Sequence, residues 1–369
     1  MQERSVRGVA GAGRLFWCDL ARVTAAGLVV LIHVSAKWFE NFGRINTFDW
    51  QVANALDSLA RMGVPWFFML SGYLLLGRKP VTFSSYLRRR FARILGPFLF
   101  FSALGALVAH AIGPAPASWN PLVDPTYYHL WFFYPLILLY FFAFFVTPVL
   151  TNPWIAIGVC YALVAVTGGG LVNLGIGGLG VGTEHTFAYF LYGLIGHYAG
   201  RLPADRRTGR IGCLALVGAV IALAVVTSDL SKATGHGNEQ LYAYVSVPVA
   251  TASVAGFIWI RTLGIRMERA VPQSARSFVA LGAGYSLAVY GLHAFILALI
   301  WRACGGTFLR MGALSGIPTL VAVVGVLSIA AAAAIAWIDK RGLLLGIESS
   351  ASRALSPRPL LAAAPSRAG

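Results

Sequence analysis

The sequence has few charged side chains, and acidic ones are the scarcest. Of its 369 residues, 11% are Asp, Glu, Lys or Arg, and only 13 are acidic. Soluble domains carry about 25% charged residues, so the chain has less than half of the usual share. Its length alone would permit about two or three soluble domains, but a chain this poor in charge argues against them.

Cysteine is also scarce, and its placement excludes the usual cysteine chemistry. The four cysteines lie far apart, each inside or at the edge of an apolar run (Cys18, Cys160, Cys213 and Cys304). No spacing typical of a metal site or a disulfide is present, so we expect four small buried hydrophobic side chains and no bound metal or cofactor. The first apolar run continues to Trp38 without a small-residue cleavage site, so no removable signal peptide is predicted.

Apolar residues fill most of the chain, at 58% of the sequence with a mean hydropathy of +0.72. A helix crosses the hydrocarbon core of a membrane with about 20 apolar residues, and it can do so because its backbone hydrogen bonds are satisfied internally. The sequence therefore predicts an all-α, polytopic integral membrane bundle with about ten transmembrane helices. The predicted spans are residues 16–36, 58–76, 94–113, 127–149, 154–172, 184–200, 211–228, 241–260, 278–301 and 316–338.

The net charge of +16 could indicate a nucleic-acid-binding protein, but the basic residues occur in short clusters between the apolar runs. These clusters follow the positive-inside rule. They predict both termini on the cytoplasmic side of the cell inner membrane, and no nucleic-acid partner. We divide the chain into a basic N-terminus (1–15), a membrane domain (16–341) and a tail rich in Ala, Pro, Ser and Arg (342–369) that is predicted to be disordered.

The first span carries three ionisable residues, which are costly inside a membrane and are therefore functional candidates. Arg22 and His33 are eleven residues apart, close to three helical turns, so their side chains share one helix face about 16 Å apart along the axis. Asp19 lies three residues before Arg22 and can pair with it. Alternatively, Arg22 extends to the membrane interface and His33 only bonds a neighbour.

A second candidate is the arginine-rich segment before the third span. Arg90 and Arg93 are three residues apart at the start of that span, so they are expected to face the same way. Paired guanidinium groups at a membrane boundary suit a ligand that carries phosphate. The alternative is a solvated loop that only follows the positive-inside rule, and we favour it for Arg88 and Arg89.

Aromatic and ionisable residues mark three further segments. His129 and Trp131 lie at the outer start of the fourth span, where an aromatic belt with a solvated histidine is the alternative. Tyr290 and His293 are three residues apart in the ninth span and share a face. Glu184 lies at the outer start of the sixth span, where a solvated side chain is the alternative.

Taken together, five motifs resemble those of the membrane acyltransferase-3 family, over about residues 16–341. Within that family the chain is most similar to the surface-polysaccharide O-acetyltransferases, typified by the enterobacterial common antigen O-acetyltransferase. The motifs are, in order, Arg22 and His33 separated by ten residues, Val64-Pro-Trp-Phe-Phe-Met-Leu-Ser-Gly-Tyr73, Arg90-x-x-Arg93 followed by Pro97, His129-Leu-Trp-Phe-Phe133, and Tyr285-Ser through Tyr290-Gly-Leu-His293. Each motif alone is weak, and their shared order makes the resemblance specific.

The resemblance implies a ten-helix membrane enzyme that moves an acyl group, usually acetyl, from a cytoplasmic acyl-CoA to a glycan hydroxyl. By that similarity His33 would be the essential histidine, and Arg22 would orient the reaction or the donor. Arg90 and Arg93 would hold the phosphates of CoA. Acetyl-CoA would be a co-substrate rather than a bound cofactor, and a surface polysaccharide or glycolipid would be the acceptor.

The residues themselves leave the mechanism and a rival function open. A neutral imidazole is the usual base near neutral pH, so His33 either takes the proton of the acceptor hydroxyl or carries the acyl group covalently. The supporting polar and aromatic candidates are Asp19, His129, Trp131, Glu184, Tyr290 and His293. The rival is a transporter or flippase of an envelope glycan pathway, which would use the same buried Arg and His as an ion path and gains no support from an internal repeat.

Overall fold

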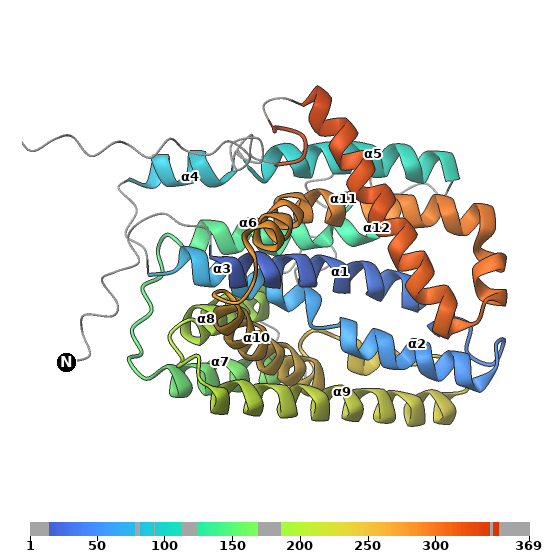
Figure 1. The fold of residues 1–369 in the computed structure, drawn as a ribbon, viewed down its shortest axis with the longest axis horizontal. Coiled ribbons are helices and arrows are strands. Elements are labelled where there is room, and N and C mark those ends of the chain that lie inside the picture. Colours follow the sequence, from blue (N-terminus) through green and yellow to red (C-terminus); the bar gives the residue numbers. More distant parts are fainter. Residues whose placement is uncertain are drawn as a thin grey trace, which may run out of the picture.

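The computed structural model describes residues 15–77, 82–91, 93–112, 124–168, 186–339 and 342–346, which form helices and no strands. An all-α fold is therefore confirmed for this part of the chain. The helices are α1 (Phe16–Phe39), α2 (Thr47–Ala60), α3 (Gly63–Leu75), α4 (Phe83–Phe91), α5 (Leu95–Ile112), the 3-10 helix η2 (Tyr128–Phe132), α6 (Phe133–Phe142), α7 (Pro153–Gly168), α8 (Thr186–Ala199), α9 (Arg206–Thr234), the 3-10 helix η3 (Gln240–Tyr242), α10 (Val247–Met267), α11 (Gln273–Arg310) and α12 (Ala313–Ile338). They form a bundle in which α1 contacts α2, α3, α10, α11 and α12 (Figure 1).

Every predicted span overlaps a helix, and five helices are long and apolar enough to cross a membrane by length and composition. These five are Phe16–Phe39, Arg206–Thr234, Gln240–Met267, Gln273–Arg310 and Ala313–Ile338. Shorter apolar helices include Leu95–Ala111, Tyr128–Phe142 and Pro153–Thr167. A membrane protein is thus supported, whereas ten crossings and the side of each terminus stay predictions.

The second predicted span consists of two helices rather than one. α2 begins at Thr47, where the Asn46 side chain accepts a hydrogen bond of 2.9 Å from the backbone N–H of Asp49, and it ends at Ala60. α3 starts at Gly63, after a turn at Arg61. The hydropathy of the run hides this break, because an average over many residues does not register a turn of two residues at Arg61 and Met62. Residues 37–57 separate the first two predicted spans, and much of this segment is helical because α2 begins within it.

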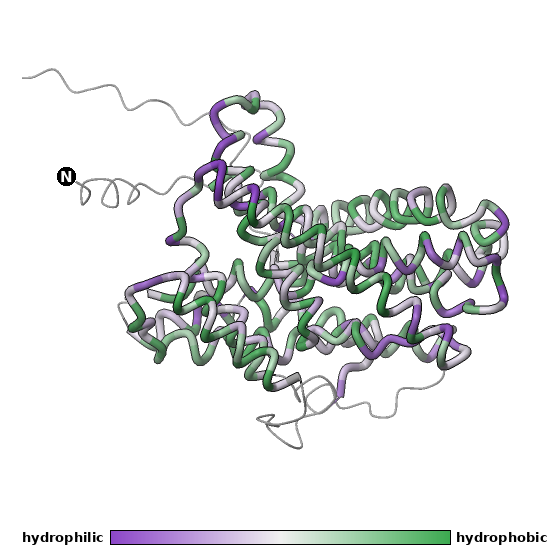
Figure 2. Tube along the Cα trace, turned by 90° about the horizontal axis from the view of Figure 1, so that it is seen from below, coloured by the Kyte–Doolittle hydropathy of each residue, from purple (hydrophilic) through white to green (hydrophobic). Residues whose placement is uncertain are grey.

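The lipid-facing character of the bundle is clearest on α9 and α12. Only 28% of the apolar window of α9 and 17% of that of α12 are buried inside the protein. Figure 2 shows apolar residues along the middle of the helices and hydrophilic residues toward their ends. An exposed apolar band of this kind fits contact with a bilayer, since monomeric soluble proteins rarely expose so large a patch.

Two cysteines depart from the burial that we expected. Cys18 and Cys160 are buried, but Cys213 is half-buried and Cys304 is exposed. The expectation was wrong at these two positions because an apolar side chain gains little from facing protein rather than lipid tails. Apolarity alone therefore does not determine which face of a membrane helix is turned inward.

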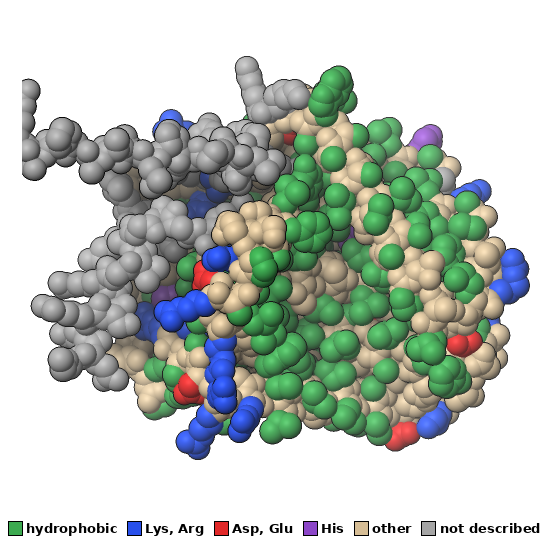
Figure 3. Space-filling view, viewed as in Figure 1, with side chains coloured by type: hydrophobic (Ala, Val, Ile, Leu, Met, Phe, Trp, Pro, Cys, Tyr) green, Lys and Arg blue, Asp and Glu red, His purple; other side chains and the backbone are tan. Residues whose placement is uncertain are grey.

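The bundle has two ends that differ in chemistry. At one end, which we call the basic end, the first turn of α1 contains Trp17, and Gly264 of α10 packs against this residue. Figure 3 shows Lys and Arg side chains gathered toward this end, near the start of α9. At the opposite end, the Trp50 indole of α2 donates a hydrogen bond of 2.9 Å to the Phe39 carbonyl at the last turn of α1. α1 therefore runs from the basic end to the opposite end.

α3 and α8 approach each other through glycines. A Cβ atom added to Gly72 would collide with the backbone of Gly193, and one added to Gly196 would collide with the backbone of Met69. Small residues let membrane helices pack backbone to backbone, which increases their dispersion contacts. This glycine seam fixes α3, whose other side lines the cavity described below.

The glycine seam predicts the effect of two matched substitutions. Gly72→Ala should lower the free energy of unfolding by about 1–3 kcal/mol, because overpacking forces the two backbones apart. Gly158→Ala is the control, since a Cβ there meets nothing within 4 Å, and it should be neutral or stabilising by about 0.5–1 kcal/mol. Thermal unfolding in detergent measures both, and equal midpoints for the two variants would contradict the close packing.

Candidate active site

A cavity of about 270 Å³ lies toward the basic end, between α1, α3, α4, α6 and α11. Arg22, Arg90 and Arg93 all line it. Its other walls include Ser71 of α3 and Tyr290 of α11. Three arginines that the sequence placed on two separate segments therefore border one space.

Arg22 makes the ion pair that its spacing predicted. Its guanidinium lies 3.8 Å from a carboxylate oxygen of Asp19, whose side chain is only 6% exposed, whereas the Arg22 side chain is 34% exposed. A single contact at this distance leaves most of the guanidinium N–H groups available for other acceptors. Arg22 can therefore bind an anionic group in the cavity while Asp19 limits its motion.

Arg90 and Arg93 reach the cavity by a different route from the one expected. They are not on one helix at the start of the third span, because Arg90 lies in the last turn of α4 and Arg93 in the turn that precedes α5. The Arg93 backbone N–H donates a hydrogen bond of 3.2 Å to the Arg90 carbonyl, which keeps the two residues together. The turn, rather than a shared helix face, directs both side chains to the cavity.

α4 is fastened to the bundle beside Arg90. The Tyr86 hydroxyl donates a hydrogen bond of 2.7 Å to the carbonyl of Tyr140 on α6. Burial raises the pKa of Tyr86 to about 12, so its hydroxyl keeps its proton and stays a donor at any physiological pH. This bond holds the arginine-bearing turn against the cavity wall.

Three histidines meet farther along α1, toward the opposite end. The ring of His293 on α11 lies with its centroid 5.0 Å from that of His33 on α1 and 5.3 Å from that of His129 on η2. His129 and His293 are buried, and His33 is half-buried. Tyr128, which is 52% exposed, places its ring 5.2 Å from His33. The structure thus brings together three candidates from three separate spans.

Hydrogen bonds fix which nitrogen carries the proton in two of these rings. A carbonyl oxygen only accepts, so Nδ1 of His293, which lies 2.6 Å from the Tyr290 carbonyl, must be a donor. For the same reason, Nε2 of His129, which lies 3.1 Å from the Gly291 carbonyl, must be a donor. In neutral rings, Nε2 of His293 and Nδ1 of His129 then remain as acceptors, and both atoms are buried without a hydrogen-bond partner in the described part of the chain.

Tyr290 joins the arginine cavity to the histidine cluster. Its side chain lines the cavity, and its hydroxyl donates a hydrogen bond to the backbone carbonyl of His129. Its ring centroid lies 5.7 Å from that of His129 and 5.9 Å from that of His293. The two sites are therefore adjacent parts of one region, although His33 itself does not line the cavity.

Trp131 is not among the residues that line the cavity. It is half-buried, and its ring packs 5.4 Å from that of Tyr189 and 5.8 Å from that of Tyr244. Glu184 lies outside the described residues. Among the residues that are described, no group of three or more His, Cys, Asp or Glu side chains could hold a metal ion.

The structure contains an ion pair that we did not predict from the sequence. Asp57 and Arg61 are four residues apart, and Arg61 Nε lies 2.8 Å from Asp57 Oδ1. Opposite charges at this spacing are a helix signal. The signal was hidden because these residues straddle the edge of the predicted span 58–76, where we assigned only apolar residues.

Comparison with known proteins places this region in a family. The acyltransferase domain family (acyltransferase 3) matches residues 15–337. The chain belongs to this family. The acyltransferase is also similar to an amino-acid racemase from Enterococcus faecalis, with 33% identity over 132 residues that make up 31% of this chain and 17% of that protein. The acyltransferase thus spans about a sixth of that relative, and no solved structure matches it.

Because the position of the ring proton is assigned in each of the two buried histidines, we can predict which amide side chain should replace each of them. An Asn amide can donate where Nδ1 of His293 does, and a Gln amide where Nε2 of His129 does, whereas Leu cannot donate. His293→Asn and His129→Gln should therefore unfold close to the unmodified acyltransferase, and His293→Leu should lose about 1–2 kcal/mol. Thermal unfolding measures all three, and a His293→Asn variant as unstable as His293→Leu would refute the assigned protonation.

Proposed function

We propose that this acyltransferase is a membrane O-acetyltransferase that moves an acetyl group from cytoplasmic acetyl-CoA to a hydroxyl of a surface polysaccharide or glycolipid. The observation that carries the proposal is the junction at Tyr290, which lines the arginine cavity and bonds the backbone of His129. A cavity suited to a donor and a cluster of imidazoles meet there. The family gives the acyl-transfer reaction, and this junction supports a division into donor and acceptor sides.

The arginine cavity suits the donor. Guanidinium groups bind phosphates through paired N–H groups, and Arg22, Arg90 and Arg93 are the cationic side chains on its walls. A volume of about 270 Å³ is too small for a whole CoA molecule, since pockets for drug-sized ligands hold about 300–1,000 Å³. We infer that the nucleotide phosphates stay at the arginines and that the thin pantetheine arm extends toward Tyr290.

The chemical step balances with His33 as the base. His33 takes the proton from the acceptor hydroxyl, and the hydroxyl oxygen attacks the carbonyl carbon of the thioester. The C–O bond forms, the C–S bond breaks, and the thiolate takes the proton from the His33 imidazolium, which leaves an acetyl ester and a CoA thiol. A covalent acetyl-His33 intermediate is the variant of this scheme, and it leads to the same products.

The neighbours of His33 support different parts of this step. Nε2 of His293 can accept a hydrogen bond from a His33 N–H if the two rings move closer together. The other nitrogen of His33 would then be available to take the proton of the substrate hydroxyl. The ring protons of His129 and His293 are committed to backbone carbonyls, so neither ring offers a donor to the oxyanion. We infer that the Tyr128 hydroxyl, beside His33, is that donor.

Arg22 serves the donor rather than the reacting carbonyl in this proposal. It lies about 16 Å from His33 along the axis of α1, which is too far for a guanidinium to reach the same carbonyl. The positive-inside rule places the basic end in the cytoplasm, where acetyl-CoA is made. The proposed location is therefore the inner membrane, with His33 reached by the donor from inside and by the acceptor from outside.

Transport or flipping of a glycan is the rival function, and the family match favours group transfer over it. The similarity to the racemase covers 17% of that protein, so we do not assign racemase activity to this chain. Acetyl-CoA turnover by the purified acyltransferase separates transfer from transport.

The first prediction of the proposal concerns His33. His33→Ala should abolish transfer of acetyl from acetyl-CoA to a glycan acceptor, because the base is lost, with a fall in kcat of about 100-fold or more. The matched control is His110→Ala, which removes an exposed histidine at the end of α5 and should leave activity unchanged. Radiolabelled acetyl transfer in membranes that hold equal amounts of each variant measures this, and activity retained by His33→Ala would exclude the assigned base.

The second prediction concerns the donor phosphates. The double variant Arg90→Ala and Arg93→Ala should raise KM for acetyl-CoA by about 10-fold or more, since each lost charge-assisted hydrogen bond costs about 1.5–3 kcal/mol. Acetyl-pantetheine, which lacks the nucleotide phosphates, should be used equally well by both proteins. Arg206→Ala with Arg210→Ala, at the same end but outside the cavity, is the control, and an unchanged KM for acetyl-CoA in the first variant would contradict the phosphate role.

A further inference from the structure

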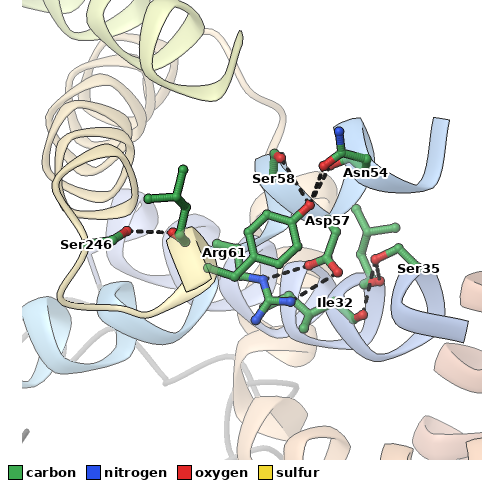
Figure 4. Close-up of polar contacts among 10 residues, drawn as sticks. Ile32, Ser35, Asn54, Asp57, Ser58, Arg61 and Ser246 are labelled. Carbon is green, nitrogen blue, oxygen red and sulfur yellow. Dashed lines mark hydrogen bonds and ion pairs between the residues drawn. The ribbon is translucent and has the colours of Figure 1, made fainter. Parts of the chain in front are cut away.

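A buried ion pair joins Asp57, in the last turn of α2, to Arg61, the residue that follows this helix. Two parallel contacts join Arg61 to Asp57, from Nε to Oδ1 at 2.8 Å and from Nη2 to Oδ2 at 3.1 Å. The Asp57 side chain is 0% exposed and the Arg61 side chain is 12% exposed. Figure 4 shows the pair on α2 beside the turn of α1 that carries Ile32 and Ser35, which is the turn of His33.

A network of tyrosine and asparagine fixes this pair in place. The Arg61 guanidinium lies 4.2 Å from the centroid of the Tyr242 ring. The Tyr242 hydroxyl donates a hydrogen bond of 2.6 Å to Oδ1 of Asn54, and it lies 3.4 Å from the Ser58 hydroxyl (Figure 4). The guanidinium is thus held on one edge by a carboxylate and on one face by a ring, which leaves little freedom to its plane.

Arg61 lies close to the half-buried Tyr244. Its guanidinium covers the ring of Tyr242, which is two residues before Tyr244. The Asp57–Arg61 pair also lies beside the turn of α1 that contains His33 (Figure 4). The end of α2 therefore brings a fixed guanidinium near both the histidine-bearing turn and the aromatic residues that follow η3.

Partly accessible aromatic rings continue from this point. The ring of Tyr244 lies 5.8 Å from that of Trp131, with 31° between their planes. Tyr128 lies against His33 and is 52% exposed. Aromatic faces with a polar tip combine an apolar surface with hydrogen bonding at an interface, which is what the C–H faces and hydroxyls of a sugar ring require.

The charged side chains on this side occur in pairs of opposite sign. Arg61 is matched by Asp57, and Lys37 lies 3.5 Å from Glu40 one turn beyond His33. At the cavity, three arginines are among the lining residues, and one of them, Arg22, is paired with Asp19. A balanced, aromatic surface favours a neutral ligand, because an anion would have to displace a carboxylate from its cation.

We propose that Arg61, Tyr128, Trp131 and Tyr244 form the acceptor subsite and that the acceptor is a neutral, hydroxyl-rich sugar. This inference rests on the proposed function, since it assigns the acceptor side of the same site. Trp131 and Tyr244 stack on the faces of the sugar, and Arg61 donates to its hydroxyls. Asp57 and Tyr242 act as positioning residues that hold the plane of the Arg61 guanidinium.

The test measures sugar binding and acetyl transfer separately, in lipid nanodiscs. The probes are four neutral methyl pyranosides (gluco, galacto, manno and N-acetylgluco) and the methyl glycosides of glucuronate and galacturonate. Binding is followed by saturation-transfer NMR without acetyl-CoA. Transfer is followed as KM for the best neutral sugar and for acetyl-CoA, together with hydrolysis of acetyl-CoA in the absence of any sugar.

Tyr244→Ala should raise KM for the sugar about tenfold, as expected for the loss of one aromatic contact, and it should erase the NMR signal of that sugar. KM for acetyl-CoA and sugar-free hydrolysis should stay within about twofold, which a general loss of folding would not allow. Arg61→Lys keeps the charge but lacks the planar fork, and it should also affect KM for the sugar alone. Tyr161→Ala is the matched control, because that tyrosine bonds Thr251 at 2.7 Å away from this surface and should change neither value.

Several results would overturn the subsite. The first is a KM for the sugar in Tyr244→Ala equal to that of Tyr161→Ala. The second is stronger binding of the glucuronate or galacturonate probe than of every neutral probe. The third is no binding of any neutral probe. Failure of the proposed function looks different. In that case the unmodified protein shows no His33-dependent turnover of acetyl-CoA, whereas binding of a neutral sugar that depends on Tyr244 would still support the subsite.

Discussion

The position of α1 is the constraint on which the site depends. This helix contacts α2, α3, α10, α11 and α12, and its buried side chains are interspersed with partly exposed ones, among them Arg22 and His33. An ionisable side chain on such a helix cannot turn to lipid without a large desolvation cost, so it must find polar neighbours on the surrounding helices. Asp19 serves Arg22 in this way, and the cluster of α11 and η2 surrounds His33. Because one helix carries both groups, the separation of Arg22 and His33 along its axis is fixed.

The sequence predicted the locations of the helices well, because long apolar runs bounded by basic clusters are a strong signal. It also predicted the Asp19–Arg22 pair, which depends only on local helical spacing. It did not predict the link between Tyr290 and His129, whose residues are 161 positions apart. Contacts of that kind depend on how the helices pack, and hydropathy carries no information about packing partners.

Local chain geometry caused the remaining differences. Arg90 and Arg93 were placed on one helix face, but a turn between α4 and α5 separates them and still directs both to one cavity. The Asp57–Arg61 pair escaped notice because a hydropathy window treats a neutralised pair as two charges at the edge of a span. A buried pair with two hydrogen bonds is far less costly than two separate charges. Charge spacing should therefore be read together with hydropathy in membrane sequences.

The glycine seam between α3 and α8 has a consequence for the walls of the cavity. α3 supplies one wall of the cavity through Phe67, Leu70, Ser71 and Leu74, and its other side is locked by Gly72 against Gly193. That wall cannot retreat without separating two backbones. On the facing side, the turn at Arg93 is covered by the short segment 342–346, where Gly346 packs on the Arg93 carbonyl. The cavity therefore has one wall that is held backbone to backbone and a facing side that consists of a turn and the segment packed on it.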